Sequence, residues 1–365
     1  MIYLDSGATS FHKPCQVRQA VLRTREQCAN PGRGGYKAAA LAQQVVYSCR
    51  ELAGEMFDCG PEQVVFTTNC THGLNLAIHT LVQPGTRVVV SGFEHNAVMR
   101  PLYARNARIT VAGRKLFDWE DTLSQFEKAL KGGAQVAVFT HTSNVFGYIL
   151  PVQEMAKLCR AYGVPFIVDA AQSAGTQPVK LRELGAEFIA MPGHKGLLGP
   201  QGTGLLLCGR EPSPLLYGGT GSEPIRHDMP DALPERAEAG TVNVPGIAGL
   251  AAGLRYLKNR GIENIAKAEE NCMKSLIGPL CKLGFQVYSG EHQCGTVSFV
   301  PRMDCEEMAG KLADLGIGVR AGLHCAPLAH ESAGTLETGT VRVSFGYDAA
   351  PWQVQRFLQK LEGVT

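Results

Sequence analysis

The chain has 365 residues, of which 45% are hydrophobic and 19% charged, enough apolar material for one large folded domain and a second, smaller one. Its 35 basic and 33 acidic residues are interleaved and give a formal net charge of +2, so neither a nucleic acid nor a membrane surface is expected as a partner. The first residues lack the pattern of a secretory signal, and no apolar run reaches the roughly 18 residues of a membrane span, which predicts a cytoplasmic protein.

Short runs of β-branched and aromatic residues alternate with helical patterns between about residue 60 and residue 210. The predicted strands are Val64–Thr67, Val88–Ser91, Val136–Thr140, Phe166–Asp169, Phe188–Met191 and Gly204–Leu207. This alternation predicts a mostly parallel sheet with helices on both faces. Ligands of such sheets bind beyond the carboxyl ends of the strands, so polar residues just after a strand are candidates for function.

The pattern changes after Gly246 to two long helical segments, at about 246–260 and 262–282. Short strands and helices follow, and the chain ends with a strand at Thr340–Phe345 and a helix from about residue 351. We interpret this part as a second, smaller domain that is joined to the first by the helix near residue 250.

Asp169 ends one predicted strand, and Lys195 follows the next one in a Gly-His-Lys-Gly sequence. Alone, an aspartate at the end of a strand is as often a helix N-cap as a functional group. An amine and a carboxylate after neighbouring strands, however, meet in one crevice. Pyridoxal phosphate (PLP) chemistry needs this pair, because a lysine forms the imine and an acid keeps the pyridine nitrogen protonated. With Gln172 close to Asp169, the pair predicts that Lys195 carries PLP as a Schiff base.

From Tyr3 to Arg342 the sequence resembles the class V aminotransferase family of PLP enzymes, starting with its Tyr-Leu-Asp-Ser-Gly-Ala-Thr segment. The resemblance implies an α/β protein with the PLP-dependent transferase fold type I. Such a protein has a large domain with a mostly parallel seven-stranded sheet and a smaller α+β C-terminal domain. Here the large domain would be 12–250, and the small domain would be 1–11 with 251–365.

The family's motifs imply roles for individual residues of this chain. Backbone amides of the turn with Cys70 and Thr71 would bind the phosphate at a helix N-terminus. His95 would stack on the pyridine ring as a catalytic residue, and Asn144 would lie near the ring hydroxyl and the substrate. Taken singly, a histidine or asparagine is more often a hydrogen-bonded structural residue.

Three further residues complete the implied cofactor site. Gln172 would reach the ring O3′, His194 would reach the phosphate, and Thr241 would reach the phosphate of the partner subunit, which implies a homodimer with shared active sites. The cysteine desulfurase branch usually has a Ser or Thr phosphate ligand two positions before the histidine, where this chain has Pro192. Proline offers neither a hydroxyl nor an amide, so other groups must complete the phosphate site.

The segment Arg320-Ala-Gly-Leu-His-Cys-Ala-Pro327 resembles the short active-site segment of type II cysteine desulfurases, a branch that includes selenocysteine-lyase-like enzymes. By this resemblance Cys325 is the nucleophile, and His324 with nearby cations would lower its pKa. Arg342, with Arg320, would bind the carboxylate of the substrate. Without these neighbours Cys325 would be interpreted as a buried small residue, as the chain's other cysteines are. None of the twelve forms a Cys-x-x-Cys pair, so we expect reduced thiols and no metal site.

Together these expectations predict a PLP-dependent cysteine desulfurase, which converts L-cysteine to L-alanine and leaves a persulfide on Cys325 for a sulfur-acceptor protein. Lys195 would also remove the Cα proton. Three alternatives stay open. They are a selenocysteine lyase on the same scaffold, a different class V reaction such as transamination or another cleavage, and a PLP-fold protein that acts only as a binding or regulatory partner.

Overall fold

The computed structural model describes residues 1–32 and 34–364, and a seven-stranded sheet forms its centre. The strand order is β2-β8-β7-β6-β5-β3-β4. The strands are β2 (Val64–Thr67), β3 (Arg87–Ser91), β4 (Arg108–Ala112), β5 (Val136–Thr140), β6 (Phe166–Asp169), β7 (Phe188–Pro192) and β8 (Gly204–Cys208). β8 is antiparallel to both of its neighbours, and the other pairs are parallel. The predicted mostly parallel, seven-stranded sheet is confirmed.

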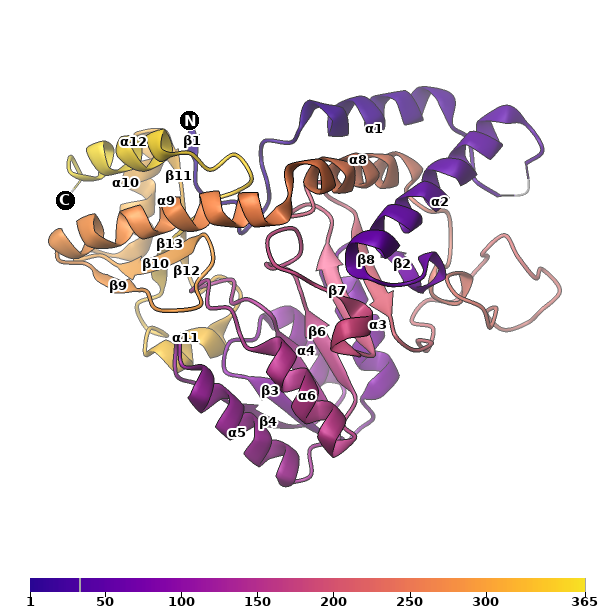
Figure 1. Ribbon diagram of the computed structural model, residues 1–365, viewed down its shortest axis with the longest axis horizontal. Coiled ribbons are helices and arrows are strands. Elements are labelled where there is room, and N and C mark those ends of the chain that lie inside the picture. Colours follow the sequence, from indigo (N-terminus) through magenta and orange to yellow (C-terminus); the bar gives the residue numbers. More distant parts are fainter. Residues whose placement is uncertain (33, 365) are drawn as a thin grey trace.

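Helices cover both faces of this sheet (Figure 1). Alternate residues of a strand point to opposite faces, so Val88 and Val90 belong to one hydrophobic core and Val89 to the other. The first core includes α3 (Cys70–Leu81) and α4 (Asn96–Ala104); the second includes α2 (Lys37–Phe57), α5 (Trp119–Lys131), α6 (Val152–Tyr162), α7 (Leu181–Leu184) and α8 (Val244–Arg260). α1 (Cys15–Gln27) lies along α8, and the short helix η1 (Pro61–Gln63) precedes β2.

A second group of elements has its own sheet and core. The sheet is antiparallel, with the order β12-β13-β10-β9. Its strands are β9 (Gln286–Tyr288), β10 (Thr296–Val300), β12 (Arg320–Gly322) and β13 (Thr340–Ser344). The helices of this part of the chain are α9 (Ile262–Lys282), α10 (Cys305–Asp314), α11 (Pro327–Ala333) and α12 (Pro351–Leu361).

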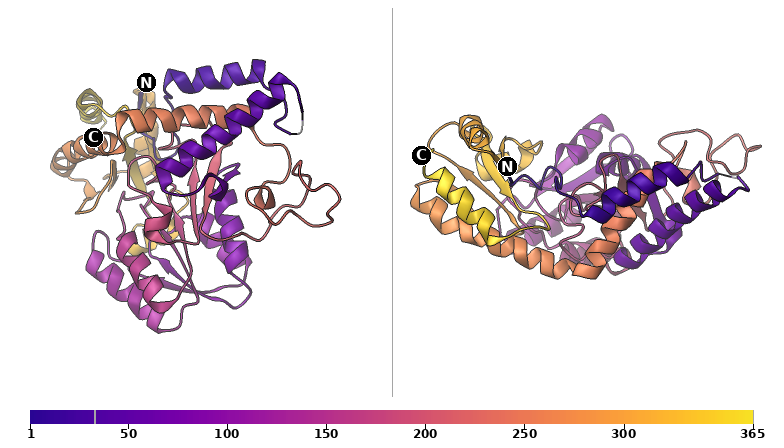
Figure 2. Two further views of the ribbon diagram at one scale, coloured as in Figure 1. Left: turned by 45° about the vertical axis from the view of Figure 1, so that its right-hand side comes forward. Right: turned by 90° about the horizontal axis from the view of Figure 1, so that it is seen from above.

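The N-terminus joins this second group, as Figure 1 shows. β1 (Ile2–Tyr3) pairs in parallel with β11 (Ile317–Gly318), and Leu4 is fully buried in the same core as α9 and α12. These contacts support the division into 12–250 and 1–11 with 251–365, which stays a prediction. α8 and α9, separated by Gly261, follow one another across the molecule and connect its two parts (Figure 2).

The segment 209–243, between β8 and α8, projects away from the body of the protein in both figures. It includes the short helix η2 (Glu235–Ala237) and exposes the large apolar side chains of Leu216, Tyr217 and Ile225. Ile225 is the most exposed of the three, with 91% of its surface exposed. None of the helices in the described residues is both long and apolar enough to cross a membrane.

Candidate active site

Asp169 and Lys195 lie beyond the carboxyl ends of two neighbouring strands. β6 and β7 pair in parallel with Asp169 opposite Ala190, and Lys195 is the third residue after the end of β7. The Lys195 loop lies against the loop after β6, since a Cβ on Gly196 would be 2.2 Å from Ala174 O. Glycine after the lysine therefore allows the two loops to approach. The structure brings the amine and the carboxylate to one place.

Both side chains line a pocket with about 520 Å³ of empty space. Six more residues of the predicted set line it: Cys70, Thr71, His95, Asn144, Gln172 and His194. The pocket lies where ligands of open α/β sheets bind. Eight residues that were chosen from separate parts of the sequence thus surround one cavity.

Burial shifts the pKa values of both central groups. It lowers the pKa of Lys195 to about 8, and the nearby charge of Arg342 adds to this effect. Burial also raises the pKa of Asp169, although Ala171 N–H and Lys195 oppose that shift. Ala171 N donates to Asp169 Oδ1 at 2.9 Å, and Cys70 Sγ donates to the same oxygen at 3.5 Å. The other carboxylate oxygen remains available to a ligand in the pocket.

The N-terminus of α3 faces this pocket and suits a phosphate. Asn69 Oδ1 caps the helix by accepting from His72 N at 2.9 Å. The first backbone N–H groups of the helix, at Cys70 and Thr71, have no preceding turn to bind, and they attract anions. Thr142 Oγ1 also lines the pocket, is buried and has no partner among the described residues. The residues present therefore fit PLP, even though Pro192 supplies no hydroxyl.

His95 and His194 are neutral in this pocket. Burial and the charge of Lys195 lower the pKa of each imidazole to about 4. His95 is the N-cap of α4, and its Nδ1 accepts from Ala97 N at 2.9 Å, which leaves the proton on Nε2. A neutral ring held at one edge is suited to stacking on a pyridine ring. His194 Nδ1 lies 3.1 Å from Thr9 Oγ1.

The side-chain amides of Gln172 and Asn144 connect the pocket to other segments. Gln172 Nε2 donates to Gly7 O at 2.9 Å, and Asn144 Nδ2 donates to His324 O at 2.8 Å. Asn144 therefore joins the pocket to the segment that carries Cys325. The backbone does the same, because Asn96 N donates to Cys325 O at 2.8 Å.

Arg342 is buried, with 2% of its surface exposed, and both of its terminal nitrogens are engaged. Nη2 donates to Asp5 Oδ1 at 2.7 Å, and Nη1 donates to Asn144 O at 2.8 Å. Nε has no partner among the described residues. Arg320 is half-exposed and donates to both oxygens of Asp5 at 2.8 to 3.2 Å. The two positive charges of Arg320 and Arg342 face only one carboxylate, that of Asp5, and Arg342 Nε–H has no acceptor among the described residues. This cluster can therefore bind one further anion.

Cys325 is exposed and lies outside the pocket's lining, in the segment between β12 and α11. Cys325 and His324 both have left-handed backbone conformations, with φ of 56° and 50°. The hydrogen bonds to Asp5 raise the pKa of Arg320, and Cys325 adds a smaller effect in the same direction. We expected His324 to help lower the pKa of Cys325, and the structure does not support this role of His324. Burial, with Arg342 next, lowers its pKa to about 2, and its Nε2 lies 3.2 Å from Thr340 O, so it is neutral and supplies no charge.

Thr241 lies apart from these residues within one chain. It is exposed at the base of the projecting segment and lines a separate cavity that also contains His72 and Asn243. Its predicted role needs a partner subunit and stays a prediction. Sequence reasoning missed Asp5 and Thr142. Asp5 lies inside the quoted N-terminal motif, but nothing local indicates that its partners come more than 300 residues later.

The comparisons with known proteins agree over nearly the whole chain. A sequence profile of the Aminotransferase class-V family matches residues 2–357. The chain is 34% identical over 385 aligned positions to a probable cysteine desulfurase from Pyrococcus abyssi, covering 99% of this chain and 94% of that protein. It is 31% identical over 345 positions to a cysteine desulfurase from Escherichia coli, covering 89% and 84%.

Two solved structures resemble the fold closely. An apo cysteine desulfurase from Thermococcus onnurineus NA1 matches with a TM-score of 0.92 and 33% identity over 100% of this chain and 94% of that one. A cysteine desulfurase from Escherichia coli matches with a TM-score of 0.88 and 25% identity over 99% and 94%. The expected PLP-dependent transferase fold type I is confirmed. With the profile match and these relatives, the chain belongs to the class V aminotransferase family.

Proposed function

We propose that the protein is a PLP-dependent cysteine desulfurase, which converts L-cysteine to L-alanine and transfers the sulfur to Cys325. One observation carries the assignment of Cys325. Its segment is hydrogen-bonded at two points, from the pocket residue Asn144 through Nδ2 to His324 O, and from Asn96 N, between the pocket residues His95 and Ala97, to Cys325 O. These contacts support Cys325 as a nucleophile that would act beside the pocket that contains Lys195.

PLP would be held by the N-terminus of α3, His194, Gln172, His95 and Asp169. When bound, it supplies an electron sink for the carbanion at the substrate Cα. Asp169, through its free oxygen, would hold the proton on the ring nitrogen. The Lys195 amine has a pKa near neutrality because it is desolvated, so it suits the exchange of a proton at Cα.

The substrate carboxylate would bind Arg342, with Arg320 nearby. The Cys325 thiolate would attack the substrate sulfur, so that an S–S bond forms as the C–S bond breaks. The carbon fragment keeps the bonding electrons and takes up a proton to become alanine. The step needs no external oxidant, because cysteine and a thiol together contain the atoms and electrons of alanine and a persulfide. An acceptor protein or a reducing thiol would then remove the sulfur.

A homodimer is part of this proposal. The apolar side chains exposed on the projecting segment 209–243, together with the position of Thr241 at its base, suit a surface that a second copy of the chain covers. In such a dimer, Thr241 of the partner subunit would supply the phosphate site with a hydroxyl group, which Pro192 cannot do.

The experiment compares Cys325→Ser with Cys281→Ser, which replaces another exposed cysteine, on α9. Both purified holoenzymes receive L-cysteine and a reducing thiol, and alanine and sulfide are measured. Cys325→Ser should retain the visible PLP absorbance and lose sulfide formation, whereas Cys281→Ser should behave as wild type. Full activity of Cys325→Ser on cysteine would contradict the assignment. Activity of Cys325→Ser on selenocysteine alone would favour the lyase alternative.

A further inference from the structure

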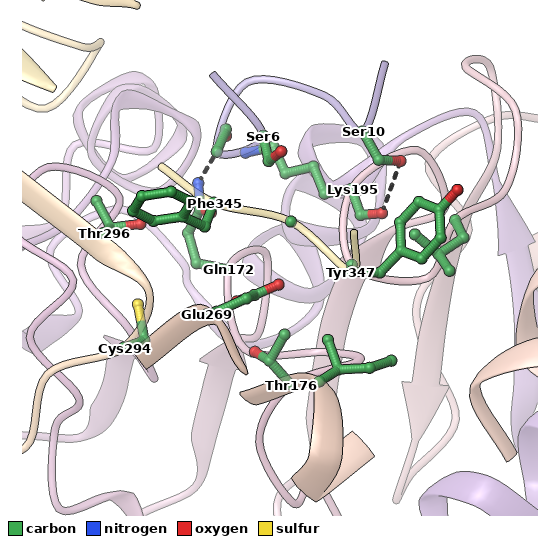
Figure 3. A pocket seen from close by; sticks show the side chains of 15 residues that line it. Ser6, Ser10, Gln172, Thr176, Lys195, Glu269, Cys294, Thr296, Phe345 and Tyr347 are labelled. Atoms are coloured by element: carbon green, nitrogen blue, oxygen red, sulfur yellow. Dashed lines mark hydrogen bonds between the residues drawn. The ribbon is translucent and has the colours of Figure 1, made fainter. Parts of the chain in front are cut away.

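A second pocket shares Lys195 and Gln172 with the predicted cofactor pocket (Figure 3). It has about 510 Å³ of empty space. Six segments meet around it: residues 6–10, the loop after β6, the Lys195 loop, α9, residues 294–296, and the segment after β13 that contains Tyr347. The pocket therefore lies at the seam between the two parts of the molecule, and nothing in the proposed reaction uses it.

Glu269, on α9, is a buried acid with no partner in this pocket. Its surface is only 7% exposed, and Figure 3 shows its carboxyl group pointing into the cavity. Among the described residues, none forms a hydrogen bond or an ion pair with it. The next residue, Glu270, shows the ordinary state of a helical glutamate. It is half-exposed and pairs with Lys274 at 2.5 Å.

The charges around Glu269 are negative. Burial raises its pKa to about 8, and the negative charge of Asp348 adds to the shift. In turn Glu269 contributes to the raised pKa of Cys294. Lys195 lines the same pocket, but the acids that act on its pKa are Asp169 and Asp5, not Glu269. None of the cations in the described part of the chain forms an ion pair with this buried carboxylate.

Oxygen atoms line the pocket from several sides. The hydroxyl group of Ser6 forms no hydrogen bond with a described residue, and Thr176 Oγ1 uses only its proton, toward Ser173 O. The ring of Tyr347 also lines the pocket, with its hydroxyl group directed away from Glu269 (Figure 3). Carboxylate and hydroxyl oxygens are ligands of hard cations. A divalent site would need more charge, and in the ranges 1–32 and 34–364 no group of three His, Cys, Asp or Glu side chains is suited to a metal ion. The single carboxylate of Glu269 would balance the charge of one monovalent cation.

We propose that the Glu269 pocket binds one monovalent cation, K⁺ or Na⁺, behind the Lys195 loop. The cation neutralises Glu269 and joins it to the hydroxyl oxygen of Ser6, so it ties α9 to the N-terminal segment. A proton is the competing occupant. A protonated carboxyl would be neutral and could donate its O–H to the same hydroxyl oxygen, so the response of the protein to added cations distinguishes the two occupants.

The test is the thermal unfolding of the holoenzyme in KCl, NaCl and choline chloride at equal ionic strength and near pH 8. Binding to the folded state raises the Tm by mass action, so the wild type should unfold at least about 2 °C higher in K⁺ or Na⁺ than in choline. Glu269→Gln should remove this difference. Glu270→Gln, which removes the same charge from the exposed side of α9, should keep it.

Two results would overturn the proposal. Equal Tm values of the wild type in all three salts would mean that Glu269 is held as a neutral acid. A cation effect that persists in Glu269→Gln would place the cation elsewhere. If Glu269→Gln does not fold, Ser6→Ala provides the same comparison, because the loss of one oxygen ligand should reduce the difference between K⁺ and choline. An undiminished difference in Ser6→Ala would then count against the site.

Discussion

Arg342 Nη2 donates a hydrogen bond of 2.7 Å to Asp5 Oδ1, although 337 residues separate the two in the sequence. Asp5 is itself buried, and it also binds Arg320. Arg342, which we propose binds the substrate, is therefore held in place by the carboxylate of Asp5, in the N-terminal segment that follows β1. A fixed guanidinium loses less entropy when it binds a second carboxylate than a mobile one does.

Asp5→Asn should weaken substrate binding. The variant keeps the shape of the side chain but loses the charge that orients Arg342, and a hydrogen bond to a charged group contributes about 1.5–3 kcal/mol. We expect the KM for L-cysteine to rise about tenfold or more, with a smaller effect on kcat. Steady-state alanine formation measures both, and Asp314→Asn, at an exposed position on α10, is the control. An unchanged or lower KM would show that Asp5 does not position Arg342.

Asn144→Asp should loosen the segment of Cys325. The new carboxylate oxygen would face His324 O, which now accepts from Asn144 Nδ2 at 2.8 Å, so attraction becomes repulsion. We expect Cys325 to react several-fold faster with iodoacetamide, measured in a background where the exposed Cys15 and Cys281 are serine.

The matched control for that variant is Asn264→Asp. Asn264 Nδ2 also donates to a backbone oxygen, of Arg260 at 2.9 Å, but on the exposed surface of α9. Its alkylation rate should equal that of the background. Equal rates in Asn144→Asp and the background would mean that the amide does not restrain the segment.

Glu94→Gln should stabilise the protein increasingly as the pH rises. Glu94 is fully buried beside Ser91, accepts from Thr140 N at 2.9 Å, and has one oxygen without a partner among the described residues. Burial raises its pKa to about 8 from an ordinary 4.5. The unfolded chain releases this proton above about pH 4.5 and the folded chain only near pH 8, so the wild type loses stability across that interval.

The glutamine variant has no proton to release at this position. Its advantage in the free energy of unfolding should grow by about 3 kcal/mol between pH 5 and pH 7.5 and level off above pH 8. Urea unfolding of both proteins at several pH values measures the difference. A constant difference from pH 5 to pH 8 would show that Glu94 is ionised throughout.

The apoenzyme should bind PLP covalently faster as the pH rises to about 8. Only the neutral amine of Lys195 is nucleophilic, and burial lowers its pKa to about 8. The rate should rise roughly tenfold from pH 6.5 to pH 8 and then level off. The growth of visible absorbance after PLP is added measures this rate. A continued rise above pH 9 would indicate an ordinary lysine, and Lys195→Arg should show no covalent binding at any pH.

Much of the fold could be predicted because its signals are local. The buried strands are short apolar runs, and their predicted limits agree with the structure to within one residue. β4 was missed because it is an edge strand, in which exposed and half-buried residues alternate from Arg108 to Val111 without an apolar run. The antiparallel direction of β8 also has no signal within the strand itself.

The positions of site residues that follow parallel strands could be predicted from the sequence. The protonation states of side chains, which depend on their surroundings in the folded protein, could not. Asp169 and Lys195 follow neighbouring strands, so their convergence follows from the sheet. The neutral state of His324 does not follow from its neighbours in the sequence, since it results from burial and from the nearby charge of Arg342. The role proposed for Thr241 depends on a second subunit, so the geometry of one chain does not contain it.

The pairing of β1 with β11 has a consequence for how the protein is made. Residues 1–5 are translated before their partners on β11, β12 and β13, which come more than 300 residues later. The large sheet can form while the nascent chain still lacks Arg320 and Arg342, so Asp5 stays without these partners during that time. A fragment that ends before Arg342 lacks the ion pair between Asp5 and Arg342, and therefore the carboxylate site that we propose.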